Sequence, residues 1–358
     1  LIDGGDGNDF IRVRPDFTST AQANSYETTV LGGDGNDTIF ASSYGNNHTR
    51  DLTLDGGAGN DSIVGTGRSN GATDILIGGD GNDTLEGGEG ADFLVGDGGR
   101  DIVSYDTSDA GVRVGLNFGT GQGGHAEGDT FAGIDGFIGS SFNDRLLLND
   151  NRGNLFLSGR DGFDTLELQQ FQDFRDDQLF SFEDIVINDV TGGRKGFNIN
   201  ADQLGGVERI RIFDRSGDVD IAVLMEDATE VDLSAIEFSG FDGGDIIRVL
   251  GDGDSEVMIG STGNDSLDAS SGNDALQGRA GNDLLDGDNG RDTLDGGTGN
   301  DTLFGDDGDD LLIGGAGADR LEGGGGEDVA VYSDSDAAVS VNLGARTASG
   351  GHAEGDQI

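Results

Sequence analysis

The chain has 358 residues, and its 70 acidic and 20 basic side chains give a formal net charge of -50. This charge excludes nucleic acid as a partner, because a polyanion repels the phosphate backbone. The sequence has no cysteine and no apolar run long enough to span a membrane, which excludes disulfides, thiolate metal sites and a transmembrane helix. Low hydrophobicity with a large net charge is typical of disordered chains, so a stable fold needs a further source of stability.

Segment 1–104 is a block of irregular repeats. Its glycine-rich loops have the form GGxGxD or close to it, and they end at Asp9, Asp37, Asp61, Asp83, Asp92 and Asp101. Segments 13–31, 41–55 and 65–77 fit the same repeat lengthened by insertions. Counting strands in register predicts one edge that carries Asp9, Asp37, Asp61, Asp83 and Asp101. The insertions should stack on the opposite edge, where Asp74 and Asp92 lie.

The inserted loops differ in composition from the rest of the chain. They contain Pro15, Phe17, Tyr26, Tyr44, His48, Arg50 and Arg68. Adaptable loops stacked on a rigid scaffold often form a binding surface. Solvated loops without a ligand are the alternative, and the sequence leaves it open.

Segment 105–168 begins inside a module that occurs twice in the chain. Residues 101–129 align without gaps with residues 328–356, so that Tyr105 matches Tyr332. Each copy follows a block of repeats, and we therefore call it a closing module. The second copy, in segment 332–358, stops short, so we expect the chain to be part of a longer protein.

Each closing module contains one histidine in a GGHAEGD loop, His125 in the first copy and His352 in the second. We interpret both as solvated loop residues, with a metal-ligand role as the alternative. Segment 169–250 then loses the repeat and gains Phe and β-branched residues in alternating patterns such as VERIRIF, which favour strands. We expect irregular coils that continue the architecture of the blocks, with an inserted β-subdomain as an open alternative.

Segment 251–331 is the most regular part of the chain. Nine nonapeptides of the form GGxGxDxUx follow one another without a gap, where U is a large apolar residue in all but the last copy. The glycines permit the positive φ angles of a tight loop, and the next three residues alternate across a short strand. Two nonapeptides then make one coil, and alternate loops stack along opposite edges. After Glu256, the sixth position places Asp274, Asp292, Asp310 and Asp328 on one edge and Asp265, Asp283, Asp301 and Asp319 on the other.

Stacked carboxylates about 5 Å apart repel one another, and the repulsion grows at the lower dielectric of a packed loop. Such a row requires a cation. Carboxylate and backbone carbonyl oxygens suit a hard divalent ion with flexible coordination, which favours Ca²⁺ over Mg²⁺ or Zn²⁺.

The recurring nonapeptide resembles the hemolysin-type calcium-binding repeats of the repeats-in-toxin (RTX) family. The resemblance implies an all-β fold, a parallel β-roll or β-solenoid with several Ca²⁺ ions in its turns, interrupted here by the less regular segment 169–250. It also implies that the metal ligands are the sixth-position residues Asp9, Asp37, Asp61, Asp83, Asp92, Asp101, Asp265, Asp274, Asp283, Asp292, Asp301, Asp310, Asp319 and Asp328. Because a nonapeptide buries only one large side chain, we expect ion binding and folding to be one event.

The sequence favours a role without catalysis for this chain, since it has no HExxH, no GxSxG and no cysteine nucleophile. A catalytic domain elsewhere in a parent protein remains open. We expect a structural or secretion module of an extracellular bacterial protein, exported unfolded by type I secretion machinery and folded by Ca²⁺ outside the cell. The alternative is a module that binds a glycan or a cell surface, as in adhesins, surface-layer proteins or polysaccharide-modifying enzymes. An ice-binding face would need an unbroken row of threonine, which the seventh positions lack.

Overall fold

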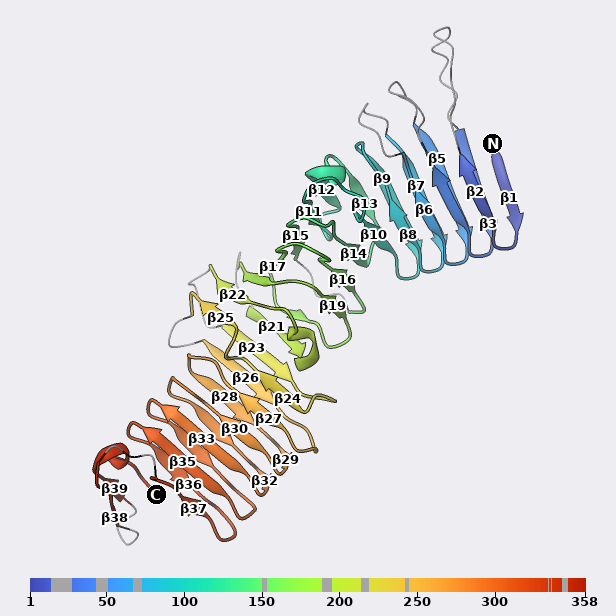
Figure 1. The fold of residues 1–358 in the computed structure, drawn as a ribbon. Helices are drawn as coiled ribbons and strands as arrows, with labels where there is room; N and C mark the ends of the chain where they lie inside the picture. Colours follow the sequence, from blue (N-terminus) through green and yellow to red (C-terminus); the bar gives the residue numbers. More distant parts are fainter. Residues whose placement is uncertain are drawn as a thin grey trace. The chain divides into compact units, whose positions relative to one another are not determined.

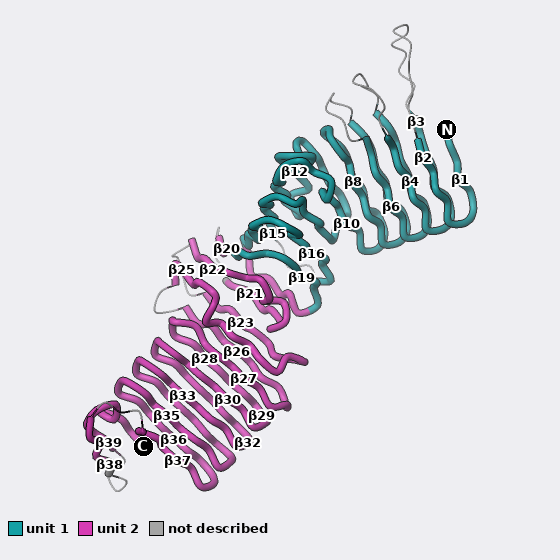
Figure 2. The backbone as a smooth tube through the Cα atoms, viewed as in Figure 1, with its two compact units in different colours: residues 1–169, 176–185 teal, residues 170–175, 186–358 magenta. Residues whose placement is uncertain are grey.

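A computed structural model describes residues 1–13, 28–42, 51–66, 73–149, 153–188, 195–213, 219–241, 245–333, 335, 337–342 and 347–358. The chain forms two compact units (Figure 2), of which unit 1 is Leu1–Gln169 with Asp176–Ile185 and unit 2 is Gln170–Arg175 with Val186–Ile358. Across the described ranges, no helix has the length and apolar character needed to cross a membrane. The finer division into five segments remains a prediction.

Unit 1 is built from coils that give one strand to each of two parallel sheets (Figure 1). The first sheet contains β1 (Ile2–Asp6), β3 (Thr28–Asp34), β5 (Leu52–Ala58), β7 (Ile75–Asp80), β9 (Phe93–Gly98) and β13 (Thr130–Ala132). The second contains β2 (Phe10–Val13), β4 (Thr38–Ala41), β6 (Ser62–Val64), β8 (Thr84–Glu86), β10 (Ile102–Ser104), β14 (Gly136–Ile138), β16 (Phe156–Ser158) and β19 (Gln178–Phe180).

The core of unit 1 follows from the pairing register. Ile63 pairs with Leu85, and Leu85 with Val103, so equivalent inward side chains stack directly on one another. All three are fully buried. The neighbours of each in its strand point outward, as the two-residue period of a strand requires.

The closing module of unit 1 departs from the parallel arrangement. Strand β11 (Arg113–Gly115) pairs antiparallel with β12 (Thr120–Gln122), which pairs antiparallel with β13. A short 3-10 helix, η1 (Gly124–Ala126), connects β12 to β13. Beyond it, β11 pairs parallel with β15 (Arg145–Leu148), and β15 with β17 (Thr165–Leu168). The sheet therefore resumes its parallel order after one hairpin. In unit 2, the second module likewise has an antiparallel pair, β38 (Ser340–Asn342) and β39 (Thr347–Ser349), and η3 (Gly351–Ala353).

Unit 2 also consists of coils with strands in two parallel sheets (Figure 1). The longer sheet contains β18 (Gln172–Asp173), β21 (Lys195–Asn200), β23 (Val219–Leu224), β26 (Ile246–Leu250), β28 (Asp265–Asp268), β31 (Leu284–Asp286), β34 (Thr302–Phe304) and β36 (Arg320–Glu322). The other contains β24 (Glu230–Asp232), β27 (Val257–Ile259), β30 (Ala275–Gln277), β33 (Thr293–Thr298), β35 (Leu311–Ala316) and β37 (Val329–Ala330). The remaining strands are β20 (Asp184–Ile187), the parallel pair β22 (Arg209–Ile212) and β25 (Glu237–Ser239), and the loop pair β29 (Ser271–Gly272) and β32 (Asn289–Gly290); η2 (Ala201–Leu204) follows β21.

The irregular segment therefore shares both sheets of unit 2 with the regular block. Strand β26 pairs parallel with β28, and β24 pairs parallel with β27. The predicted all-β parallel solenoid is confirmed, and the described residues 195–213, 219–241 and 245–250 belong to it. The eighth-position side chains from Met258 to Leu321 are buried as expected, whereas Ala330 in the last repeat is exposed.

Candidate metal-binding loops

The sixth-position carboxylates of successive coils stack into rows, which we call ladders. In each step, the backbone N–H of one member donates to a carboxylate oxygen of the next, as from Asp283 to Asp301 Oδ1 at 2.8 Å. The ladders are Asp9-Asp37-Asp61-Asp83-Asp101, Asp74-Asp92-Asp129, Asp144-Asp164-Glu183, Glu256-Asp274-Asp292-Asp310-Asp328 and Asp265-Asp283-Asp301-Asp319-Asp356. The stacking expected from the sequence is thus present in both blocks. The inserted loops with Tyr26, His48 and Arg68 lie outside the described residues.

Most ladder members keep one buried carboxylate oxygen without a hydrogen-bond partner. Asp301, for example, is 1% exposed, and its Oδ2 has no partner although its Oδ1 accepts from Asp283. A buried, unpaired polar atom is costly, so such an oxygen points to a ligand. Among the described ladder residues, the unpartnered oxygens belong to Asp9, Asp37, Asp61, Asp83, Asp92, Asp101, Asp164, Glu256, Asp274, Asp283, Asp292, Asp301, Asp310 and Asp319.

A backbone carbonyl approaches the same point as the free carboxylate oxygen. A Cβ atom placed on Gly296 would lie 2.5 Å from Asp301 Oδ2 and 2.7 Å from the carbonyl oxygen of Gly314, in the next loop of that edge. Only glycine fits at this position. Two oxygens from adjacent coils therefore converge on one small space, and this donor set suits Ca²⁺.

Burial raises the pKa of the ladder carboxyls. Desolvation, with repulsion from neighbouring carboxylates, raises the pKa of Asp92 to about 8, and desolvation with repulsion from Asp265 raises that of Asp283 to about 7. Desolvation also raises the pKa of Asp301 to about 6. Burial in the loop therefore disfavours the ionised form of each carboxyl group, and a bound cation would offset this energetic cost.

A second row of hydrogen bonds joins the loops at the fifth position. The backbone N–H of Asn300 donates to Asn282 Oδ1 at 2.7 Å, and the N–H of Asn282 donates to Asn264 Oδ1 at 2.8 Å. These bonds run in the opposite direction along the coils to those of the carboxylates. The asparagine that precedes many ladder aspartates thus helps to hold successive loops at a fixed separation.

Sequence reasoning missed several ladder members. Asp129 and Asp356 come from the closing modules, and Asp144, Asp164 and Glu183 follow the first module. The spacing Gly-x-x-x-x-Asp, as in 139–144 and 159–164, could have identified Asp144 and Asp164. Asp129 has the same spacing from Gly124, but an antiparallel hairpin rather than a nonapeptide brings it beside Asp92.

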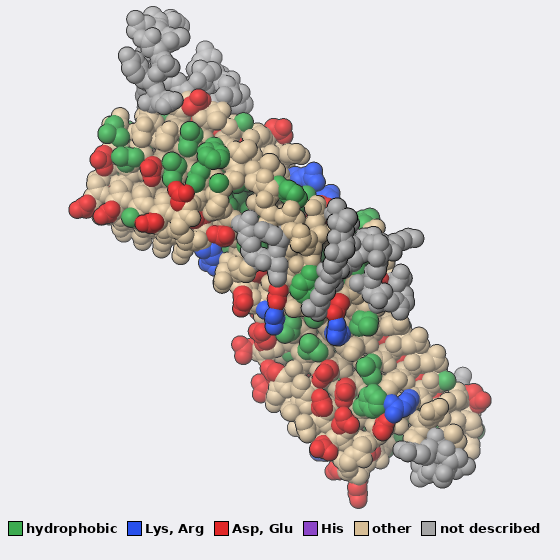
Figure 3. Space-filling view, turned by 180° about the vertical axis from the view of Figure 1, so that it is seen from behind, with side chains coloured by type: hydrophobic (Ala, Val, Ile, Leu, Met, Phe, Trp, Pro, Cys, Tyr) green, Lys and Arg blue, Asp and Glu red, His purple; other side chains and the backbone are tan. Residues whose placement is uncertain are grey.

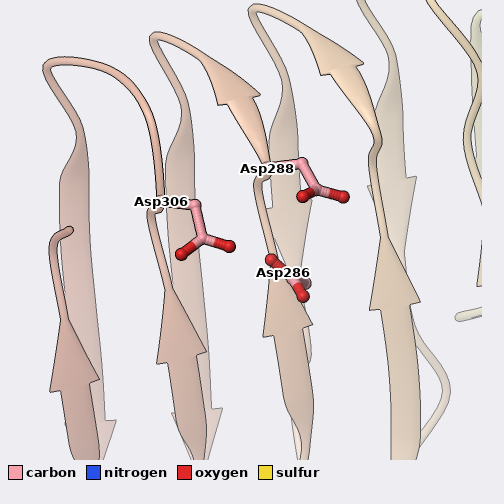
Figure 4. A group of neighbouring side chains, drawn as sticks. All are labelled: Asp286, Asp288 and Asp306. Atoms are coloured by element: carbon pink, nitrogen blue, oxygen red, sulfur yellow. The ribbon is translucent and has the colours of Figure 1, made fainter. Parts of the chain in front are cut away.

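A further acidic group lies beside the ladder of Asp292 (Figure 4). Asp286 ends β31, Asp288 follows two residues later, and Asp306 occupies the equivalent position to Asp288 in the next coil. One carboxylate oxygen from each lies within 4.8 Å of the others. Desolvation and repulsion from Asp288, Asp306 and Asp268 raise the pKa of Asp286 to about 6. The ninth and second positions of the repeat therefore add carboxylates that the sequence analysis did not consider.

The two histidines of the closing modules are held alike through their backbone. The N–H of His125 donates to Ser108 Oγ and that of His352 to Ser335 Oγ, each at 3.0 Å. The expectation of a solvated side chain is wrong for His125, which is only 9% exposed. His125 lies in η1, which packs against β12, and the sequence pattern did not reveal its burial.

Comparison with known proteins supports the calcium-binding interpretation of the loops. The family model described as RTX calcium-binding nonapeptide repeat (4 copies) matches residues 1–13, 23–43, 53–67, 69–103 and, in overlapping matches, 250–330. No curated protein matches the chain in sequence. The matched residues contain all of the sequence-predicted ligands, although the ligand role of each individual residue remains a prediction. The chain therefore contains RTX-type calcium-binding nonapeptide repeats in both blocks of a parallel β-solenoid.

Proposed function

We propose that this chain is a non-catalytic module that folds when Ca²⁺ binds to its ladders, as part of a secreted bacterial protein exported unfolded by a type I system. The row of buried, unpartnered carboxylate oxygens carries this proposal. Without a cation, folding removes the charged carboxylates of each row from water, and this desolvation costs free energy. The metal-free fold is therefore disfavoured at neutral pH. Low cytosolic Ca²⁺ would keep the chain extended for export, and extracellular Ca²⁺ would fold it.

Calcium titration of the isolated chain tests this proposal. Circular dichroism and small-angle scattering should show an expanded chain in chelator and a cooperative gain of β-structure with a smaller radius at millimolar Ca²⁺. Mg²⁺ should substitute poorly, because it demands octahedral geometry and dehydrates reluctantly. A compact, β-rich protein in excess chelator would contradict the proposal.

A second candidate function is glycan binding, and a hollow on unit 1 favours it. The hollow has a volume of about 290 Å³ and is lined by Arg113, Gly115, Phe118, Thr120, Gln122, Leu147 and Gln169. Phe118 is 48% exposed, and an aromatic face beside planar amide and guanidinium groups suits a sugar ring. On the face shown in Figure 3, acidic side chains are widespread and cationic side chains are few.

The second closing module provides a natural control for this hollow. It carries Ser340 where the first has Arg113, Ala345 where the first has Phe118, and Ser349 where the first has Gln122. The double variant Arg113→Ser, Phe118→Ala therefore gives the first module residues that occur in the second. On a glycan array, the calcium-loaded chain should bind and the double variant should lose that binding while keeping its Ca²⁺ stoichiometry. Equal binding by both proteins would contradict this second function.

A further inference from the structure

Three ladders begin with a loop whose carboxylate accepts hydrogen bonds from the N–H and the hydroxyl of the second residue of the same loop. In the loop 260–265, the N–H of Ser261 donates to Asp265 Oδ2 at 2.7 Å, and the Ser261 hydroxyl lies 3.0 Å from both carboxylate oxygens. Ser140 binds Asp144 in the same way, through its N–H to Oδ2 at 2.6 Å and its hydroxyl to Oδ1 at 2.8 Å.

Thr66 repeats this arrangement in the N-terminal block. Its N–H and its hydroxyl both donate to Asp74 Oδ2 at 2.8 Å. Asp74, Asp144 and Asp265 are all buried, and none of them retains an unpartnered oxygen. In these three loops, the aspartate Oδ2 accepts a hydrogen bond from within the same loop, whereas in most of the other described loops it has no partner.

The backbone at the second position separates the two kinds of loop. In loops with a free Oδ2, this residue has a positive φ, whether it is glycine, as at Gly297 with 96°, or not, as at Arg279 with 76°. Thr66, Ser140 and Ser261 are not among the described residues with positive φ. Their N–H can then point at the carboxylate of their own loop.

Ser270 shows that a hydroxyl side chain alone is not sufficient. It occupies the second position of the loop that ends at Asp274, but its φ is 67° and its hydroxyl contacts the carbonyl of Gly251 at 3.4 Å. Asp274 Oδ2 remains buried and unpartnered. Ser270 and Ser261 are thus the same residue at the same loop position on opposite ladders, with opposite effects.

The far ends of two ladders are closed by a different hydroxyl. Tyr105 donates its phenolic O–H to Asp129 Oδ2, and Tyr332 donates to Asp356 Oδ2, each at 2.9 Å. Asp129 and Asp356 are the last members of their ladders, where the closing module replaces the next loop. The ladder of Asp265 therefore has a hydroxyl donor at both ends and free oxygens only at Asp283, Asp301 and Asp319 between them.

We propose that these hydroxyl groups are end caps that take the place of Ca²⁺, so that no ion lies between the loops of Asp265 and Asp283 in the native protein. The inference rests on the proposed calcium-binding function and specifies which of the stacked loops take part. At Asp129 and Asp356, where the closing module replaces the next loop, a neutral donor ends the row without requiring a cation shared with a coil that offers no matching loop. The second residue of a loop thereby decides whether that loop binds an ion.

The variant Ser261→Gly tests the proposal, with Ser270→Gly as its matched control. Glycine removes the hydroxyl and permits the positive φ of the ion-binding loops. After equilibrium dialysis against Ca²⁺ and elemental analysis, Ser261→Gly should bind one more ion per chain than the wild-type protein, and Ser270→Gly should bind the same number. An unchanged stoichiometry in Ser261→Gly, or an equal gain in both variants, would overturn the proposal. A wild-type chain that binds no Ca²⁺ would instead refute the proposed function.

A crystal structure of the calcium-loaded wild-type protein provides a test that does not depend on the folding of a variant. Anomalous scattering should place ions beside Asp283 Oδ2 and Asp301 Oδ2 and none beside Asp265 Oδ2. An ion bound to Asp265 Oδ2 would overturn the end-cap assignment even if every other site were occupied as expected.

Discussion

The irregular and regular regions of unit 2 share the same sheets but are stabilised differently. In the irregular region, β21 and β23 pair through six residues and bury Phe197, Ile199 and Val223 almost completely, whereas β31 and β34 in the regular block pair through three. Phe174 packs edge-on against Phe197 with ring centroids 6.2 Å apart. The regular block buries one large apolar side chain in each repeat except the last and adds rows of buried carboxylates. The proposed function therefore implies that apolar burial stabilises the irregular region and bound ions stabilise the regular block, so that only the regular block responds to Ca²⁺.

Removal of Ca²⁺ should produce the largest difference between the two regions. In excess chelator, backbone amides of residues 251–331 should lose their protection from hydrogen exchange, because repulsion within the ladders is no longer offset. Amides of β21 and β23 should retain more protection, since their packing does not involve a carboxylate ladder. Hydrogen exchange measured by mass spectrometry checks this, and uniform loss of protection would show that the two regions fold as one unit.

The effect of replacing a ladder carboxylate in the regular block should depend on its position along the ladder. Asp292 lies between Asp274 and Asp310, whereas Glu256 begins its ladder. Asp292→Ala should therefore lower both the Ca²⁺ stoichiometry and the folding midpoint more than Glu256→Ala, with a cost of about 3–5 kcal/mol if it resembles the loss of one partner from a buried ionic pair. Calcium titration by calorimetry and circular dichroism measures both quantities. Equal effects would argue against ions shared between stacked loops.

Truncation of an aromatic core residue should affect the irregular region without changing ion binding. Phe197→Ala removes a fully buried ring and should cost about 3–5 kcal/mol of unfolding free energy. The Ca²⁺ stoichiometry of the folded variant should be unchanged. Phe213, which is 60% exposed, supplies the control, since Phe213→Ala should change stability little. Denaturant unfolding in saturating Ca²⁺ distinguishes the two, and a lower stoichiometry in Phe197→Ala would show that the regions are coupled.

Acidification should stabilise the calcium-free regular block modestly. The pKa of Asp283 is raised from 3.8 to about 7 and that of Asp301 to about 6, so the folded state binds protons more tightly than the unfolded state. Folding stability without Ca²⁺ should therefore rise as the pH falls from about 7 towards about 4. With Ca²⁺ the trend should reverse, because protons compete with the ion for the carboxylates. Thermal unfolding followed across this range, with and without chelator, measures both trends, and the same pH trend in both conditions would contradict the assignment.

Much of the fold followed from local spacing. The nine-residue period placed Leu303 inward and Thr302 and Phe304 outward, and the structure buries only Leu303 completely. The same period stacked Asp283, Asp301 and Asp319, because residues that recur once per coil occupy equivalent positions. The closing hairpin was not predicted, since nothing in its sequence showed that β11 and β12 would pair antiparallel.

The sequence by itself determined the solenoid and the two carboxylate edges of the regular block, and it predicted oxygen donors suited to Ca²⁺. Only the tertiary structure decided which carboxylates keep a free oxygen. Ser261 and Ser270 are identical in type and loop position, yet one engages its carboxylate and the other does not. The physical reason is that spacing fixes the face of a strand on which a side chain lies, whereas one φ angle, set by packing against neighbouring coils, fixes which atoms a loop residue can reach.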